Sequence, residues 1–175
     1  TKSANYDNLK KLTPNENIRV SATILPAIYV KGPPGHLERI KGADELLKLG
    51  YQISMNIDPI IFTADTVKTY KKIIDDIKTH FDYESERFHR ITIGMLRFGT
   101  KNRDNNIRKR HKDLYRHSET YMTKIKGDEK FRYDRDKRVD IYKELIAYIQ
   151  SEMPGVEVEL STEPVDVWTD VGLTP

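Results

Sequence analysis

Residues 36–58 carry the clearest change of hydrophobic pattern in the chain. Apolar side chains first recur every three or four residues, which predicts an amphipathic helix. These positions are Leu37, Ile40, Ala43, Leu46 and Leu47. Gly50 follows where a C-cap glycine is expected, and from Tyr51 the period changes to two. The segment therefore predicts a helix, a glycine stop and a strand whose polar side carries Gln52, Ser54, Asn56 and Asp58.

The same two patterns recur along the rest of the chain. Alternation predicts further strands, and apolar spacing predicts further helices. The strands are expected over residues 18–24, 91–97 and 156–161, and the helices over residues 65–80 and 136–152. Strands that alternate with helices form parallel sheets with right-handed crossovers. We therefore predict an α/β fold in a single domain spanning residues 1–175.

The polar strand faces are the first indication of function. Both faces of a strand in an α/β layer are normally buried in apolar surroundings, so a polar face needs an explanation. In a barrel lined by polar groups, the apolar face packs on helices and the polar face lines a ligand-binding lumen. Ligands in such folds gather at the carboxyl ends of the strands, which here carry Thr23, Asp58 and Arg97.

Three residues on these strands are candidate ligand contacts. Ser21 and Thr23 would direct hydroxyl groups into the lumen, but no general-base motif accompanies them, so neither is assigned as a nucleophile. Asp58 either binds a ligand or caps the loop that follows it. Both interpretations of Asp58 stay open at this point.

Composition excludes several classes of chemistry. The 175 residues contain no cysteine, which rules out disulfides, thiolate zinc sites and cysteine-ligated iron–sulfur clusters within this chain. The five histidines form no HExxH or H-x-H unit, so we predict no metal site. No apolar run approaches the roughly 20 residues that span a bilayer. We therefore expect a soluble, cytoplasmic protein without a membrane partner.

One stretch is strongly basic although the formal net charge of the chain is only +3. Between Phe98 and Tyr121, arginine and lysine are interleaved with tyrosine and histidine. Such a segment either contacts nucleic-acid phosphates or is a solvated helix face. The residues that we assign to nucleic-acid binding, with the strand end that precedes them, are Arg97, Lys101, Arg103, Arg108, Lys109 and Arg110.

Six stretches, in order along the chain, together resemble the C-terminal half of the spore photoproduct lyase family and its radical S-adenosylmethionine (SAM) relatives. They are Thr1-Lys2-Ser3, Arg19-Val20-Ser21, Leu37 through Tyr51, Asp58-Pro59-Ile60-Ile61, Ile91 through Phe98, and Phe131-Arg132-Tyr133. The resemblance implies a partial (half) TIM-like barrel with mostly parallel strands and helices on the outer face. It also implies SAM and a [4Fe-4S] cluster as cofactors, and repair of a thymine dimer in DNA by a 5′-deoxyadenosyl radical.

The resemblance assigns roles to particular residues. Lys2 and Ser21 match SAM-contacting positions of the family, and Thr23 and Asp58 share the cofactor side with them. Tyr133 falls near the substrate side, which makes it the expected catalytic residue. The basic segment would then face DNA.

One departure from the family changes what this chain can do. Family members bind their cluster through a CxxxCxxC loop in the N-terminal half, and this chain has no cysteine. Three explanations remain open: a removed N-terminal half, a separate polypeptide that supplies it, or a degenerate remnant. A half-barrel also has an open strand edge near its beginning, which predicts pairing with a complementary half or self-association. The alternative function is a non-catalytic α/β nucleic-acid-binding module.

Overall fold

The computed structural model describes residues 6–15, 17–26, 35–124, 127 and 130–175. Its centre is a four-stranded parallel sheet in the order β1-β2-β3-β7. The strands are β1 (Arg19–Thr23), β2 (Gln52–Ile60), β3 (Phe88–Met95) and β7 (Glu157–Leu160). The predicted parallel α/β fold is confirmed, and the strand bounds differ from the predicted ones by one to three residues.

The sheet has one apolar face, which its register makes continuous. Ala22, Met55, Ile91 and Val158 lie side by side on the four strands, and a second row joins Ile57, Ile93 and Leu160. All seven side chains are buried. Burying this face against helices supplies most of the driving force for folding, since apolar burial contributes about 25 cal/mol per Å².

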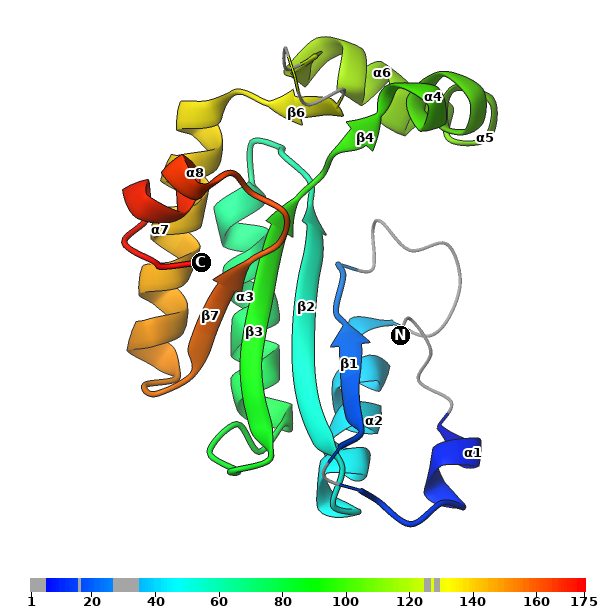
Figure 1. Cartoon of the computed structure of the whole chain (residues 1–175), viewed down its shortest axis with the longest axis vertical. Coiled ribbons are helices and arrows are strands. Elements are labelled where there is room, and N and C mark those ends of the chain that lie inside the picture. Colours follow the sequence, from blue (N-terminus) through cyan, green and yellow to red (C-terminus); the bar gives the residue numbers. More distant parts are fainter. Residues whose placement is uncertain (1–5, 16, 27–34, 125–126, 128–129) are drawn as a thin grey trace.

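Three long helices cover the apolar face. They are α2 (His36–Lys48), α3 (Thr66–His80) and α7 (Arg135–Glu152). Figure 1 shows α2 and α3 behind the sheet and α7 beside β7. Gly50 follows α2 with a φ of 104°, a left-handed conformation that favours glycine, as the sequence pattern predicted. At the start of α7, the Asp134 carboxylate accepts hydrogen bonds from the N–H groups of Asp136 and Lys137.

A smaller unit lies beyond the carboxyl ends of the strands (Figure 1). It is a three-stranded antiparallel sheet in the order β4-β6-β5 with short helices around it, and we call it the cap. Its elements are β4 (Phe98–Gly99), α4 (Thr100–Asn102), η2 (Arg103–Ile107), α5 (Arg108–Arg110), α6 (Lys112–Tyr121), β5 (Met122–Lys124) and β6 (Lys130–Tyr133). The sequence indicated a charged segment here but not this second sheet.

A buried ionic cluster joins the cap to the main sheet. The Glu163 side chain is only 1% exposed, and its Oε2 lies 3.3 Å from Arg138 Nε while its Oε1 lies 3.7 Å from Arg132 Nη1. Tyr142 donates its hydroxyl hydrogen to Glu163 at 2.9 Å and accepts the N–H of Met95 at 2.8 Å. The cluster therefore connects β3, β6 and α7 with the segment after β7.

Two short helices complete the described chain. The first, α1 (Asp7–Lys10), lies beside β1, and α8 (Val165–Asp170) lies beside α7 (Figure 1). Arg135 joins α7 to α8 through Asp166 at 2.8 Å and Asp170 at 2.6 Å. Within the described ranges, no helix combines the length and apolar character needed to cross a membrane.

Candidate functional site

The sheet face opposite the helices is polar from edge to edge. The register places Thr23, Asn56, Thr92 and Glu159 side by side across all four strands, and we call these residues the polar row. All four are half-buried. Their hydroxyl, amide and carboxylate groups stand in a line. The row can therefore donate hydrogen bonds to a bound molecule and accept hydrogen bonds from it.

A second group of polar side chains lies at the carboxyl edge of the sheet. Arg97 Nη1 lies 3.3 Å from Asp58 Oδ2, and Arg97 Nη2 donates to Ser161 Oγ at 3.3 Å. We call Asp58, Arg97 and Ser161 the edge cluster. Gly94 lies between Asp58 and Ser161, and a Cβ there would come within 2.7 Å of Ser161 Cβ and 2.9 Å of Asp58 Cγ. The missing side chain at Gly94 therefore allows the edge cluster to form.

At the amino end of the sheet, a histidine on β3 bridges the side chains of β1 and β2. Arg19 Nη2 lies 3.2 Å from His89 Nδ1, and His89 Nε2 is hydrogen-bonded to Gln52 Oε1. Because a guanidinium can only donate, Nδ1 accepts and the ring is neutral with its proton on Nε2. Burial, followed by the charges of Arg19 and Arg90, lowers the pKa of His89.

Tyr133, the expected catalytic residue, lies inside the cap and is fully buried. Its hydroxyl oxygen accepts the N–H of Phe62 at 3.2 Å and lies 2.7 Å from His117 Nε2. Burial lowers the pKa of His117, which favours a neutral ring whose Nε2 shares a hydrogen bond with the Tyr133 hydroxyl. The Tyr133 hydroxyl is thus hydrogen-bonded to two groups of the protein, the Phe62 N–H and the His117 ring.

The basic side chains lie on the cap helices. Lys101 on α4 and Arg108, Lys109 and Arg110 on α5 are exposed, as are Lys112 and Arg116 on α6. These six cations therefore reach solvent from three of the cap helices.

Arg103 differs from its basic neighbours because it points into the protein. It is 8% exposed, and its Nε donates to Ser118 Oγ at 2.9 Å. Its guanidinium carbon lies 4.4 Å from the centre of the Tyr115 ring and 4.1 Å from that of Phe131. The assignment of Arg103 to nucleic-acid binding is therefore not supported by its position, since these contacts make it a brace between η2, α6 and β6.

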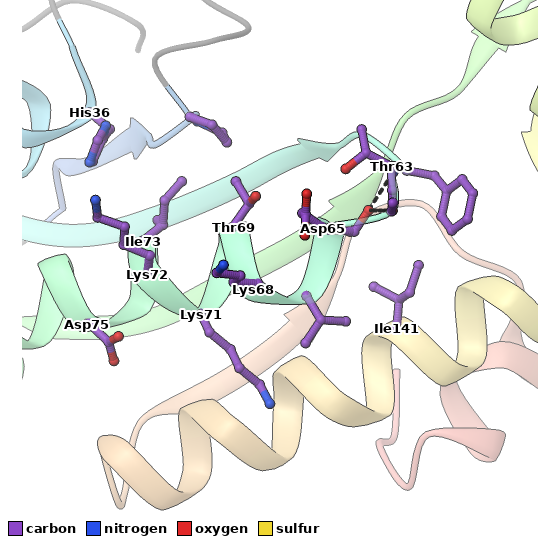
Figure 2. A pocket seen from close by; sticks show the side chains of 15 residues that line it. His36, Thr63, Asp65, Lys68, Thr69, Lys71, Lys72, Ile73, Asp75 and Ile141 are labelled. Carbon is purple, nitrogen blue, oxygen red and sulfur yellow. Dashed lines mark hydrogen bonds between the residues drawn. The ribbon is translucent and has the colours of Figure 1, made fainter.

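A groove lies on the other side of the molecule, along α3 (Figure 2). It measures about 1010 Å³ and is lined by Lys68, Lys71 and Lys72 among others. Figure 2 shows Lys71 pointing toward α7 and Lys72 lying on the side of His36. Lys71 pairs with Glu144 at 3.8 Å and His36 Nε2 lies 2.9 Å from Asp76 Oδ2, so both side chains already have partners within the protein. We place the candidate site on the polar sheet face, where polar groups of four strands converge.

Structural comparison shows what this arrangement is similar to. No family model and no curated protein matches the sequence. Solved structures do match. The fold resembles that of spore photoproduct lyase. A mutant solved with bound AdoMet and dinucleoside spore photoproduct superposes with a TM-score of 0.74 at 18% identity, over 90% of this chain and 48% of that one. The enzyme complexed with dinucleoside spore photoproduct gives a TM-score of 0.75 at 18% identity, over 92% and 50%.

The chain thus spans about half the length of the spore photoproduct lyase structures that it matches. At this identity the likeness concerns the fold, and it agrees with the predicted half-barrel. The polar row lies where a barrel has its lumen, opposite the covering helices.

The structure brings some of the predicted site residues together and separates others. Thr23, Asp58 and Arg97 share the polar face with Ser21, which pairs in register with Ser54. Arg97 was assigned to nucleic acid, and in the structure its partners are Asp58 and Ser161. Lys2 lies outside the described residues. The roles of all these residues stay predictions.

Sequence reasoning did not single out Asn56, Thr92, Glu159, Ser161 or Gly94. The alternating pattern had placed Asn56, Thr92 and Glu159 on polar strand sides, but only the register shows that they form one row with Thr23. Among the described residues, no three metal-binding side chains gather as a metal site requires.

Proposed function

We propose that this chain is the C-terminal half of a cytoplasmic radical SAM enzyme of the spore photoproduct lyase type, completed by an N-terminal half that carries the cluster cysteines. The observation that carries the proposal is the continuous polar row on a parallel half-barrel. The match to half of an enzyme solved with AdoMet and a dinucleoside photoproduct supports it.

The polar face fits one of the two implied cofactors. SAM has ribose hydroxyls, an ammonium and a carboxylate, and the face supplies complementary groups at Ser21, Thr23, Asn56 and Asp58. When bound beside a reduced cluster, SAM supplies the radical that abstracts hydrogen from the substrate. In the proposal, Ser21 and Thr23 orient the molecule by hydrogen bonds, and Arg97 holds the Asp58 carboxylate so that it accepts hydrogen bonds from a ligand.

The iron–sulfur cluster does not fit this chain. Clusters of this kind are held by cysteine thiolates, and the sequence contains none. Accordingly, no step of the proposed reaction is assigned to a cluster bound by these residues. The contribution of this chain is to bind and orient SAM and to form the wall on the substrate side.

The proposed substrate is a thymine dimer in DNA, positioned by the cap at the carboxyl ends of the strands. Tyr133 belongs to this side. Because the Tyr133 hydroxyl lies 2.7 Å from His117 Nε2, the two groups share one hydrogen.

The decisive experiment is co-expression of this chain with a cysteine-containing N-terminal half, followed by anaerobic cluster reconstitution. We expect SAM to be cleaved to 5′-deoxyadenosine, and Asp58→Asn to weaken SAM binding. Glu144→Gln, on the outer face of α7, is the matched control and should behave like the wild type. A cluster-loaded complex that leaves SAM intact would refute the proposal.

A second candidate function rests on the exposed cations of the cap: a module that binds nucleic acid without catalysis. Its charges lie on adjacent helices, and phosphate contacts by such a surface give strongly salt-dependent affinity. We expect binding to duplex DNA at low salt that does not depend on SAM.

Alanine substitution tests this second candidate. Replacing Arg108, Lys109 and Arg110 together should weaken DNA binding at least about tenfold at low salt and reduce the slope of affinity against salt. Replacing the exposed Lys11, Lys68 and Lys72 removes the same charge elsewhere and is the control. Equal losses in the two triple variants would show that only net charge matters.

A further inference from the structure

We propose that Thr162 is a positioning residue, whose left-handed backbone directs Ser161 to the edge cluster and Glu163 to the cap. The three residues follow the end of β7, and we call them the β7 turn. Through this turn, the buried ionic cluster at Glu163 fixes the geometry of the Arg97–Asp58 pair. The inference rests on the proposed function in one respect, because it takes Asp58 as a contact for SAM. It adds a route by which the cap acts on that contact.

Thr162 has a backbone conformation that threonine rarely adopts. Its φ is 53°, in the left-handed region, and the other left-handed residues in the described part of the chain are glycines. A β-branched side chain crowds the backbone there, so the conformation is strained. Thr162 is exposed, so packing of its own side chain does not hold this conformation. Such strain persists only where the surrounding contacts fix the chain, and it is frequent at functional sites.

Ser161 is held on the side of the main sheet. Its N–H donates to the Ile93 carbonyl at 2.8 Å, which continues the pairing of β7 with β3. Its Oγ accepts from Arg97 Nη2 at 3.3 Å, and the same nitrogen lies 3.3 Å from Asp58 Oδ2. A Cβ at Gly94 would come within 2.7 Å of the Ser161 Cβ, so Ser161 has little room to move. Ser161 thus helps to orient the Arg97 guanidinium toward Asp58.

The other half of the β7 turn is held on the side of the cap. Arg132 on β6 donates from Nη2 to the Thr162 carbonyl at 3.0 Å, and its Nη1 lies 3.7 Å from Glu163 Oε1. Arg138 on α7 lies 3.3 Å from the other carboxylate oxygen. Both arginines are buried, which strengthens these contacts because little water screens them. The arginines therefore bind the turn at the strained residue and at the residue after it.

Tyr142 provides a second connection from the same cluster to Arg97. Its hydroxyl donates to Glu163 at 2.9 Å and accepts the Met95 N–H at 2.8 Å. The Met95 carbonyl in turn accepts from Arg97 Nη1 at 3.3 Å. Arg97 is therefore hydrogen-bonded to two segments, and each of them is bound by the Glu163 cluster. We expect a shift of this cluster to reach the guanidinium that orients the Asp58 carboxylate.

The first test measures the Arg97 guanidinium in the folded chain, without SAM. Hydrogen bonds slow the rotation of a guanidinium group, and ¹⁵N NMR measures the rotation rate. Glu163→Gln and Ser161→Ala should each increase the rate at least about threefold. Glu152→Gln, which breaks the exposed pair with Lys78, is the matched control and should leave the rate unchanged. A wild-type rate in Glu163→Gln would overturn the inference.

Substitutions of Thr162 test the backbone conformation itself. Glycine adopts the left-handed region without strain, so Thr162→Gly should keep or raise the urea midpoint. Thr169→Gly, at an exposed site within α8, should lower the midpoint because glycine is unfavourable inside a helix. Equal losses in these two variants would show that Thr162 is not strained and would overturn the inference.

Thr162→Pro removes the left-handed conformation, because proline fixes φ near about −65°. It should increase the rotation rate of the Arg97 guanidinium, whereas Thr162→Gly should leave that rate unchanged. A wild-type rate in folded Thr162→Pro would overturn the positioning role of Thr162. If Thr162→Pro does not fold, Glu163→Gln decides the same question.

Affinity for SAM connects the β7 turn to the proposed function. The probe is SAM itself, titrated into the complex of this chain with a cysteine-containing N-terminal half. Glu163→Gln and Ser161→Ala should each weaken binding at least about threefold. Because both act through Arg97, the double variant should lose less affinity than the product of the two single losses. Independent, fully multiplicative losses would contradict coupling through the turn.

The inference and the proposed function fail in different ways. A wild-type complex that does not bind SAM would refute the proposed function, and the NMR rates would still decide the inference. Normal SAM binding that Glu163→Gln leaves unchanged would overturn the inference and leave the proposed function intact.

Discussion

Arg97 and Asp58 form an ion pair across the carboxyl edge of the sheet, with 3.3 Å between Nη1 and Oδ2. Asp58 lies near the end of β2, and Arg97 lies in the link between the main sheet and the cap. Each side chain is 23% exposed, so the pair is shielded from bulk water but still reachable by a ligand. This pairing orients the Asp58 carboxylate, which the sequence left as either a ligand contact or a loop cap.

Gly94→Ala should disturb this edge directly. The added Cβ would lie 2.7 Å from Ser161 Cβ and 2.9 Å from Asp58 Cγ, so both side chains must move. We expect a loss of about 1–3 kcal/mol in the free energy of unfolding, measured by urea denaturation. Gly99→Ala is the control, because a Cβ there meets nothing within 4 Å. Similar losses in both variants would contradict the packing described for Gly94.

Glu163→Gln should destabilise the connection between sheet and cap. The substitution keeps the shape of the side chain but removes the negative charge that faces the buried guanidinium groups of Arg132 and Arg138. Removing one partner of a buried ion pair costs about 3–5 kcal/mol, and we expect a value near the lower end because the amide still accepts from Tyr142. Glu152→Gln, which breaks the exposed pair with Lys78, should change stability little. Equal urea midpoints for the two variants would show that the buried ionic cluster at Glu163 does not stabilise the connection between cap and sheet.

Tyr133→Phe separates a structural from a catalytic role of its hydroxyl. The change leaves the Phe62 N–H and His117 without their partner, and the expected loss of stability is about 1–2 kcal/mol. Tyr121→Phe alters an exposed ring of the same aromatic group and should have little effect. Product formation per folded enzyme is then measured in the reconstituted complex. A decrease with Tyr133→Phe but not with Tyr121→Phe would assign the Tyr133 hydroxyl to the reaction. Unchanged product formation would limit it to packing.

His89 should make stability depend on pH. Its pKa is lowered in the folded state, so the folded protein holds the ring neutral while the unfolded chain binds a proton near the ordinary value of about 6.5. The stabilisation is therefore present above that pH and is lost as the pH falls below it. We expect unfolding free energies measured between about pH 7.5 and 5 to decline less in His89→Gln than in the wild type.

His117 acts in the same direction, because burial lowers its pKa as well. A double variant of His89 and His117 should thus have a flatter profile than either single variant. A His89→Gln profile with the slope of the wild type would contradict the neutral ring between Arg19 and Gln52.

Most of the central sheet could be predicted from local pattern. The change of period at Gly50 predicted both α2 and β2, and the polar sides of the strands predicted a ligand-facing surface. The cap could not be predicted in this way, because β4, β5 and β6 are two to four residues long and too short for a period to appear. The pairing of β4 with β6 also depends on contacts between residues about 30 positions apart, such as Phe98 with Phe131.

The candidate site shows the same division. Ser21, Thr23 and Asp58 were found because they occupy polar positions or ends of strands, which are local features. The charge run from Lys101 to Arg110 was visible as well, but Arg103 and Arg108 look alike in sequence. Their difference in burial arises from the rings of Tyr115 and Phe131, which only the folded chain brings to Arg103.

By itself, the sequence determined the order of helices and strands, the polar and apolar sides of each strand, and the absence of thiolate ligands. These follow from side-chain periodicity and composition, which need no long-range contact. Only the tertiary structure decided which polar residues form one row, that Arg97 pairs with Asp58, and that Glu163 joins the cap to the sheet. Register and charge burial arise from packing between distant segments, and no local pattern encodes them.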